Sequence, residues 1–325
     1  MNVRRIRAAL AAFLLCLLAA QGWSQDYNFG PAKDSVAKLS QLNTEIANSR
    51  GQISGLFFGP AKIDVRCEYQ CFIGICLRWA TFYYNLDFSH WKPSMDSLLA
   101  SQQQYSLNFN NNFQSQFRAW VGTVNNINAA LQQTSANVTQ LQADLPHLDP
   151  ATASKRRQDI QNQLTEISRQ IDSSSKQVQG LMSQVAAYLQ QQNRNQESLA
   201  QQKASFATNV NASFQKMKEF IDQQPCSGNA WDQFNGFKGR INGSLDSIDK
   251  TLGSLRASAS IADQSGSVLI GSMMNMANRM NLVTSQLAKA QTIQGTNDAL
   301  SNLHIKVAAQ AWQDFATYAA AQVGK

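Results

Sequence analysis

Three cysteines, Cys67, Cys71 and Cys76, fall within the ten-residue segment CEYQCFIGIC. Cysteines this close together serve as metal ligands, as a redox centre or as disulfide bonds. The spacing C-x3-C-x4-C lacks the paired short spacings of a zinc site, although His90 follows as a further ligand type, and the C-x-x-C redox motif is absent. The segment therefore predicts disulfides, with zinc as the alternative.

Cys226 is the remaining cysteine of the expected mature chain, and four cysteines permit three pairings. Cys71 and Cys76 flank FIGI, in which Ile73-Gly74 can form a tight hairpin turn. Such a turn would place the two sulfurs on facing strands at disulfide distance. We therefore expect Cys71 to pair with Cys76, which leaves Cys67 for Cys226.

Residues for acid–base catalysis are few. The three histidines, His90, His147 and His304, lie in three different segments without an assembled acid–base group. The sequence has no phosphate-binding loop, nucleophile elbow or H-E-x-x-H motif. We expect the protein not to be an enzyme and to need no cofactor or metal.

The first residues resemble a secretory signal peptide. A basic start, MNVRRIR, is followed by an apolar run from Ala8 to Ala20 and by small residues at Gly22 and Ser24. The apolar run is shorter than the roughly 20 residues that a membrane-spanning helix needs. We expect residues 1–24 to be removed and the protein to be exported to the periplasm or the exterior of a Gram-negative bacterium.

The net charge of the chain argues against nucleic acid as a partner. Removal of the three arginines in residues 1–24 lowers the formal net charge from +7 to +4. The longest basic block is Lys155-Arg156-Arg157, which fits the solvated start of a helix. Without a basic stripe, the chain is not expected to bind nucleic acid.

Residues 25–95 are expected to form a head with a short helix and a hairpin. The helix follows the turn FGPAK at 29–33 and has an apolar stripe that includes Val36, Leu39 and Leu42. Six aromatic residues then occur within 13 positions, more than a two-stranded hairpin can bury by itself. We expect these residues to bind a partner: Trp79, Phe82, Tyr83, Tyr84, Phe88 and Trp91.

Residues 96–225 are predicted to form a long antiparallel helical hairpin. An apolar stripe of four-three spacing runs from Phe109 to Leu145 and stops at LPHLDP, residues 145–150. A second stripe with heptad spacing runs from Ile160 to Tyr188, weakens across 190–197 and resumes at 199. Asp149 is the expected cap of this second helix, with Pro150 at its first position. The two helices are expected to span roughly 50 and roughly 70 residues and to lie antiparallel, because the connection is short.

Residues 226–325 are expected to form helices that pack on this hairpin. A heptad-like series runs from Ile241 to Met280, and a break is expected at Gly295-Thr296-Asn297. The last predicted helix carries one apolar stripe, made of Leu300, Leu303, Val307, Ala311, Phe315 and Tyr318. The expected fold class is all-α, an elongated antiparallel helical bundle or coiled-coil hairpin with a small disulfide-stapled, aromatic-rich β-hairpin head.

The segment CEYQCFIGICLRWATFYYNLDFSHWKP, residues 67–93, resembles the cysteine-rich N-terminal segment of TraU-like proteins from integrating conjugative elements. The matching positions are Cys67, Tyr69, Gly74, Ile75, Cys76, His90 and Pro93. The resemblance implies a periplasmic component of a conjugative type IV secretion apparatus. Its partners would be other secretion-apparatus proteins or further copies of the chain.

An alternative function belongs to another class. Helical pore-forming toxins of the haemolysin-BL and cytolysin-A kind are similar in outline, with very long antiparallel helices and a short apolar element that inserts into a membrane. Only this alternative implies membrane contact, and VLIGSMMNM at 268–276 would be the apolar element. Because Leu269, Met273 and Met276 continue the preceding heptad, we expect this stretch to be bundle core.

Overall fold

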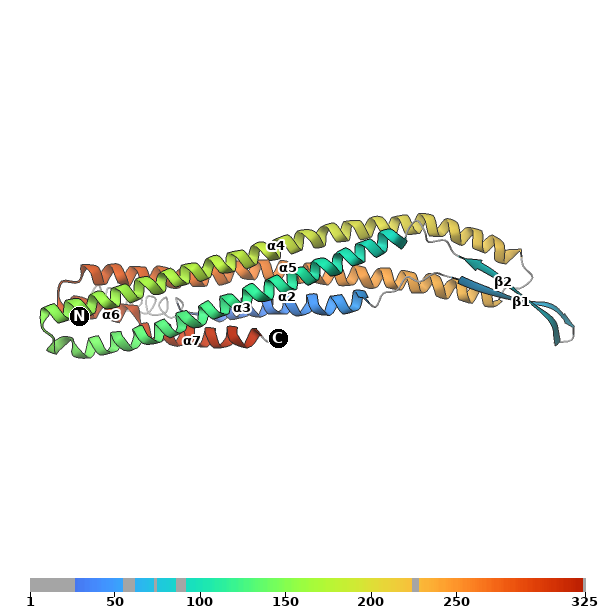
Figure 1. Cartoon of the computed structure of the whole chain (residues 1–325). Helices are drawn as coiled ribbons and strands as arrows, with labels where there is room; N and C mark the ends of the chain where they lie inside the picture. Colours follow the sequence, from blue (N-terminus) through green and yellow to red (C-terminus); the bar gives the residue numbers. More distant parts are fainter. Residues whose placement is uncertain (1–26, 55–61, 73–74, 86–91, 224–227, 324–325) are drawn as a thin grey trace, which may run out of the picture. The chain divides into compact units, whose positions relative to one another are not determined.

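The structure is a computed structural model that describes residues 27–54, 62–72, 75–85, 92–223 and 228–323 (Figure 1). The chain divides into two compact units, and each is described by itself. Unit 1 comprises residues 1–43, 112–186 and 260–325, and unit 2 comprises residues 44–111 and 187–259. The predicted signal peptide lies outside the described residues.

Helices make up most of the described chain, and two strands follow the first of them (Figure 1). In chain order the elements are α2 (Gly30–Ser54), β1 (Lys62–Phe72), β2 (Ile75–Asn85), α3 (Lys92–Asp144), the 3-10 turn η1 (Leu145–His147), α4 (Pro150–Asp222), α5 (Gly228–Lys289), α6 (Ile293–Leu303) and α7 (Ile305–Gln322).

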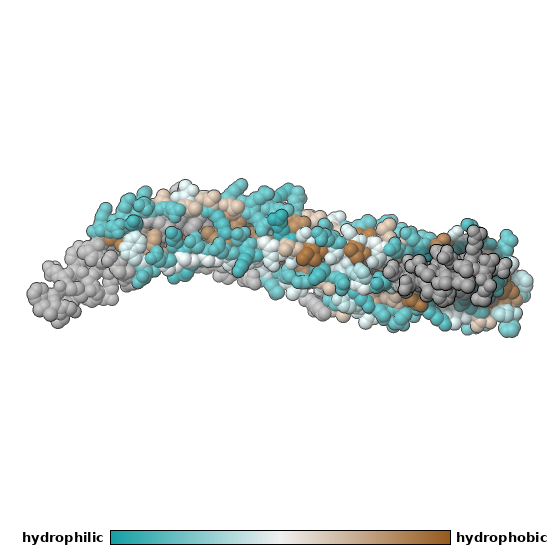
Figure 2. Space-filling view, turned by 180° about the vertical axis from the view of Figure 1, so that it is seen from behind, coloured by the Kyte–Doolittle hydropathy of each residue, from teal (hydrophilic) through white to brown (hydrophobic). Residues whose placement is uncertain are grey.

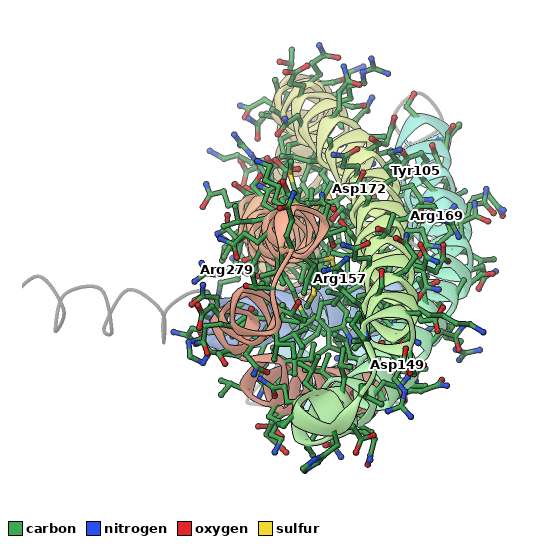
Figure 3. All side chains as sticks on the ribbon, turned by 90° about the vertical axis from the view of Figure 1, so that its left-hand side faces the viewer. Tyr105, Asp149, Arg157, Arg169, Asp172 and Arg279 are labelled. Atoms are coloured by element: carbon green, nitrogen blue, oxygen red, sulfur yellow. The ribbon has the colours of Figure 1, made fainter. Side chains whose placement is uncertain are left out.

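The predicted long helices are confirmed. Helix α3 has 53 residues and α4 has 73. Asp149 accepts hydrogen bonds from the backbone N–H groups of Ala151 and Thr152, at 2.9 and 3.0 Å, so it caps α4 as expected. The Thr152 hydroxyl and these N–H groups lower the pKa of the Asp149 carboxyl. Asp149 lies at the beginning of α4 in Figure 3.

The end of α5 differs from the prediction. Residues 295–297 lie inside α6, and the interruption comes earlier, between Lys289 and Ile293. Thr292 caps α6 by accepting a 3.0 Å bond from the Gly295 N–H. Arg157 of α4 donates to the Ala290 carbonyl just beyond α5 and lies between the helices in Figure 3. The expected break is wrong because a glycine in the first turn of a helix is tolerated there once a cap is present.

A second difference lies in the last helix. The sequence predicts one helix from Leu300 onward, but His304 separates α6 from α7. Its backbone has φ 45° and ψ 41°, in the left-handed region. The apolar stripe expected for a single helix is therefore divided, and Val307, a member of that stripe, is 56% exposed.

A buried indole and its partners connect three helices in unit 1. The Trp120 N–H of α3 donates to the Ser174 hydroxyl of α4 at 2.9 Å. The Ser174 hydroxyl in turn lies 3.8 Å from the Met273 sulfur of α5. All three side chains are fully buried. This chain of contacts fixes which parts of α3, α4 and α5 lie side by side.

The same core includes α7 and the segment before α2. The Trp312 N–H donates to the Val124 carbonyl of α3 at 2.9 Å. The Phe29 ring packs against Trp312 and Phe315, with centroid distances of 5.3 and 5.1 Å. The Ser40 hydroxyl of α2 donates to the Gln322 carbonyl at 3.1 Å. Together these contacts join α2, α3 and α7.

The methionine-rich part of α5 is core, as the heptad spacing predicts. Leu269, Met273 and Met276 are fully buried. Their neighbours Val268 and Met274 are about half exposed, at 46% and 47%. Figure 2 shows a mainly hydrophilic surface on which apolar residues form small separate patches. No helix within the described ranges has a stretch both long and apolar enough to cross a membrane.

One close approach in unit 1 depends on a glycine. Gly266 of α5 is buried, and a Cβ atom at this position would lie 1.7 Å from the sulfur of Met182 on α4 and 2.5 Å from its Cγ. Helices α4 and α5 therefore pack here through the Met182 side chain against bare backbone. By contrast, a Cβ at Gly271 of the same helix would have nothing within 4 Å.

We predict that Gly266→Ala lowers the free energy of unfolding by about 1–3 kcal/mol, because the added methyl displaces Met182 in a packed core. The matched control Gly271→Ala should raise it by about 0.5–1 kcal/mol through helix propensity. Urea denaturation followed by circular dichroism measures both. In a Met182→Ala background the cost of Gly266→Ala should vanish, and an unchanged cost there would show that the contact is not its cause.

Candidate functional site

The first candidate site is the antiparallel hairpin formed by the two strands. The register pairs Lys62 with Asn85 at one end and Phe72 with Ile75 at the other. Residues 73–74, the predicted turn, lie outside the described residues. In this register Cys71 stands opposite Cys76, and Cys67 stands opposite Ala80.

The register bears on the cysteine pairing. Directly opposed residues of an antiparallel pair have Cα atoms about 4.5–5.5 Å apart. A disulfide requires a Cα separation of about 4.4–6.8 Å, so this backbone is compatible with a bond between Cys71 and Cys76. Cys226 lies outside the described residues. Both disulfides remain predictions.

The aromatic residues expected to bind a partner are concentrated on β2. Trp79, Phe82, Tyr83 and Tyr84 lie on this strand, whereas Phe88 and Trp91 fall outside the described residues. Their register partners on β1 alternate between charged and apolar residues: Glu68 opposite Trp79, Val65 opposite Phe82, Asp64 opposite Tyr83 and Ile63 opposite Tyr84. The structure therefore brings four of the six together on one strand.

The second candidate site is a buried polar layer in unit 2, formed by Gln102, Ser106, Tyr188, Gln192 and Asn195. The Gln102 amide donates to the Ser106 hydroxyl at 3.2 Å, and this hydroxyl lies 3.3 Å from the Tyr188 hydroxyl. The Gln102 carbonyl accepts from Gln192 at 3.3 Å and from Asn195. Polar side chains of α3 thus contact those of α4 directly.

Tyr188 is the titratable member of this layer. Burial raises the pKa of its phenol to about 12, and hydrogen bonds with Ser106 and Gln102 oppose the rise. Its ring packs against Phe109 at a centroid distance of 4.5 Å and stacks on Tyr105 at 5.8 Å. Tyr188 therefore stays neutral and acts as a structural hydrogen-bonding group.

The layer is incompletely satisfied. The Gln192 side chain is fully buried, and its carbonyl oxygen lacks a hydrogen-bond partner. Such a group costs roughly 1–3 kcal/mol relative to a satisfied one. The layer therefore lowers stability locally, while its specific donors and acceptors define one alignment of α3 and α4.

Sequence reasoning missed this layer, although its pattern is present. Tyr188, Gln192 and Asn195 occupy positions at which the four-three spacing of α4 continues from Ile160 to Leu199. The interval 190–197 was interpreted as a weakening of the apolar face. It is a continuation of the same buried face with amides in place of aliphatic side chains.

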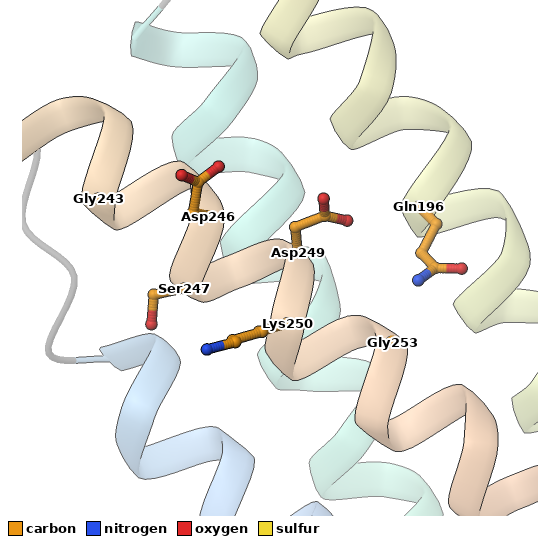
Figure 4. Close-up of a pocket in the computed structure, with 7 residues that line it drawn as sticks. All are labelled: Gln196, Gly243, Asp246, Ser247, Asp249, Lys250 and Gly253. Atoms are coloured by element: carbon orange, nitrogen blue, oxygen red, sulfur yellow. The ribbon is translucent and has the colours of Figure 1, made fainter.

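An ion-pair cluster lies elsewhere in unit 2. Lys203 of α4 contacts Asp246 and Asp249 of α5 at 3.3 and 3.0 Å. Burial lowers the pKa of Lys203, but the bonds to the two carboxylates outweigh this effect and raise it. The two carboxylates line an open hollow of about 740 Å³, and Lys250 points away from them in Figure 4.

The carboxylates of this cluster are open to solvent. The carboxylate side chains of Asp246 and Asp249 are 78% and 54% exposed, and exposed ion pairs contribute little to stability. Within the described ranges, no three His, Cys, Asp or Glu side chains lie where they could bind a metal ion. His147 lies in η1 and His304 between α6 and α7, and His90 is outside the described residues.

Comparison with solved structures identifies the fold. The soluble SmhA component of the tripartite alpha-pore forming toxin Smh from Serratia marcescens matches with a TM-score of 0.54 at 12% sequence identity, over 92% of this chain and 94% of SmhA. A second crystal form of SmhA matches with a TM-score of 0.53 at 11% identity over the same shares. No protein-family model and no curated protein matches the chain.

This likeness corrects the TraU-like resemblance. The chain shares its helical fold with a pore-forming toxin component over 92% of its length, whereas the resemblance covered only residues 67–93. The expectation of a conjugative type IV secretion component, with secretion-apparatus partners, is therefore wrong. Cysteine spacing over a short segment does not constrain the rest of the fold, so it is weak evidence for a family.

We predict that mass mapping of the protein, purified without reductant, will show a peptide in which Cys71 is linked to Cys76, and a second linkage between Cys67 and Cys226. The opposed positions of Cys71 and Cys76 make the first bond independent of the second. Cys226→Ser should therefore free Cys67 and leave the Cys71–Cys76 bond intact. Four alkylatable thiols with one bound zinc per chain would contradict both linkages.

We predict that the folded chain loses stability at alkaline pH because of Tyr188. The pKa of its phenol is raised from the ordinary value of 10.0 to about 12, so the unfolded chain releases this proton first. The stabilisation is fully present below pH 10 and is lost progressively between pH 10 and 12, on the order of 2 kcal/mol in all. Tyr188→Phe should flatten this decline in urea titrations, whereas Tyr318→Phe, outside the layer, should not. Equal declines in both variants would exclude Tyr188 as the cause.

Proposed function

We propose that this chain is an exported, non-enzymatic component of an α-pore-forming toxin. The observation that carries the proposal is the likeness of its fold to SmhA over nearly the whole of both chains. The burial of the aliphatic and methionine stripes supports it, because a toxin component must first exist as a stable protein in water. No cofactor or metal enters this function.

Membrane contact is assigned to the hairpin of β1 and β2. Trp and Tyr side chains favour the membrane–water interface, because they combine an apolar ring with a polar group. Strand β2 carries Trp79, Tyr83 and Tyr84 within six residues. The charged register positions on β1 would remain in the headgroup region, where water and lipid phosphates are present.

Self-association follows from the same proposal. A single hairpin of two strands cannot satisfy its outer backbone groups inside a membrane, so further copies or further components are needed at the lesion. The low proportion of charged residues, 15%, leaves wide amide-rich faces along the helices. Such faces can pack laterally without strong charge repulsion.

Binding to lipid vesicles tests this proposal better than lysis does, because the similar protein is one part of a tripartite toxin. We predict that the purified mature chain floats with phosphatidylcholine–phosphatidylglycerol vesicles in a density gradient. The double substitution Tyr83→Ala/Tyr84→Ala should reduce the bound fraction at least tenfold, the loss expected for removing two interfacial aromatic side chains.

The matched control is Trp231→Ala, which removes an aromatic residue of α5 outside the hairpin and should leave binding unchanged. Far-UV circular dichroism of each variant separates loss of binding from loss of fold. A wild-type chain that remains at the bottom of the gradient at micromolar concentration would contradict the membrane role.

A further inference from the structure

The junction of α6 and α7 is strained. His304 is the one non-glycine residue of the described chain with a positive φ, 45°. The left-handed conformation costs an L-residue energy because Cβ approaches the following carbonyl oxygen, and glycine is the residue that avoids this cost. Neither glycine nor proline lies between Thr296 and Gln322, so no residue type in this stretch requires a break.

A hydrogen bond from the other end of the chain occupies this junction. The Tyr27 hydroxyl donates to the Leu303 carbonyl at 2.8 Å in a buried position. In an uninterrupted helix this carbonyl would accept from the Val307 N–H. Here the Val307 N–H donates instead to the His304 carbonyl at 2.9 Å. Tyr27 thus takes the place of a helical donor.

The residues after Tyr27 anchor it to α7. The Phe29 ring stacks on Phe315 at 5.1 Å and meets the Trp312 ring edge-on at 5.3 Å. Tyr27 and Phe29 are 5% and 4% exposed. The segment 27–29 therefore covers the junction and the first turns of α7 as one packed piece.

The break determines which residues are buried. Leu303 of α6 and Trp312 of α7 are both fully buried. They are nine positions apart, which in one continuous helix would place them on opposite sides, at about 100° per residue. Only a change of direction at His304 brings both into the same core.

The sequence encodes a second arrangement. In one continuous helix, Leu300, Leu303 and Val307 would lie on a single face with three later residues: Ala311, Phe315 and Tyr318. In the broken form Val307 is 56% exposed, the largest exposed fraction among the bulky apolar residues of the described chain. A continuous helix would place Val307 four residues after Leu303 on one face.

We propose that Ile293–Gln322 is a two-state segment that the Tyr27–Phe29 segment keeps in its broken form. Departure of Tyr27 frees the Leu303 carbonyl, which then accepts from the Val307 N–H. His304 returns to the right-handed region, and α6 and α7 become one helix with one apolar face. Because the evidence is the junction itself, the proposal is independent of the toxin assignment.

The test is a distance measurement by double electron–electron resonance, with nitroxides attached to genetically encoded ketone residues at the exposed positions Gln294 and Gln313. In a continuous helix the 19 intervening steps give a backbone separation of about 28 Å. The broken wild-type form should give a shorter main distance. Tyr27→Phe removes only the donor hydroxyl and should raise the population at the long distance about fivefold.

Two substitutions at the junction act in opposite directions. His304→Gly relieves the left-handed strain and should lower the long-distance population about fivefold, also in the Tyr27→Phe background. His304→Ala keeps the strain, favours a continuous helix and should raise it. His304→Gly also keeps the proposal testable if Tyr27→Phe folds poorly, because it should fold at least as well as wild type. Distance distributions that do not respond to these substitutions would overturn the proposal.

Discussion

Alignment of very long helices is the constraint on which this structure depends. A heptad stripe repeats, so α3 and α4 could slide by seven residues and still bury much of their apolar surface. Flanking charges often prevent such slippage, but charged residues are only 15% of this chain. Buried polar groups take over that role here: the Trp120–Ser174 bond in unit 1 and the layer around Gln102 in unit 2 each satisfy their donors in one alignment. The unpaired carbonyl of Gln192 shows that this specificity costs stability.

The long helices could be predicted because their information is local and repeated. Many apolar residues at four-three spacing define each helix, and the Asp149–Pro150 start of α4 follows from capping chemistry alone. The polar layers were missed because a buried amide and an exposed amide are the same letter in a sequence. Gln192 and Asn195 are recognisable as core only through their place in the heptad, which composition hides. The position of the break between α5 and α6 could not be predicted from glycine alone. The Thr292 hydroxyl accepts from the Gly295 N–H, so α6 begins before this glycine.

The cysteine segment shows a different limit. Its spacing was informative about local geometry, since Cys71 and Cys76 stand opposite each other in the hairpin. The same residues were misleading about identity, because seven matching positions in a short segment do not constrain the remaining fold. The stripes of α3 to α5 carried the better information about relatives, although they name no chemistry. Similarity that extends over a whole helical fold is therefore visible only once the structure is known.

Helices α6 and α7 are the part of the chain where sequence pattern and structure disagree. In most of the chain, pattern and structure agree, and one stripe gives one buried face. Between Leu300 and Tyr318 they disagree: the local pattern fits a continuous helix, while tertiary contacts from Tyr27 and Phe29 impose a break at His304. Such a conflict between local and global preference is rare in a sequence selected for one state. In the proposed two-state segment, the strain at His304 lowers the free energy needed to leave the broken form. The conflict lies in unit 1, whereas the strands proposed to contact lipid belong to unit 2.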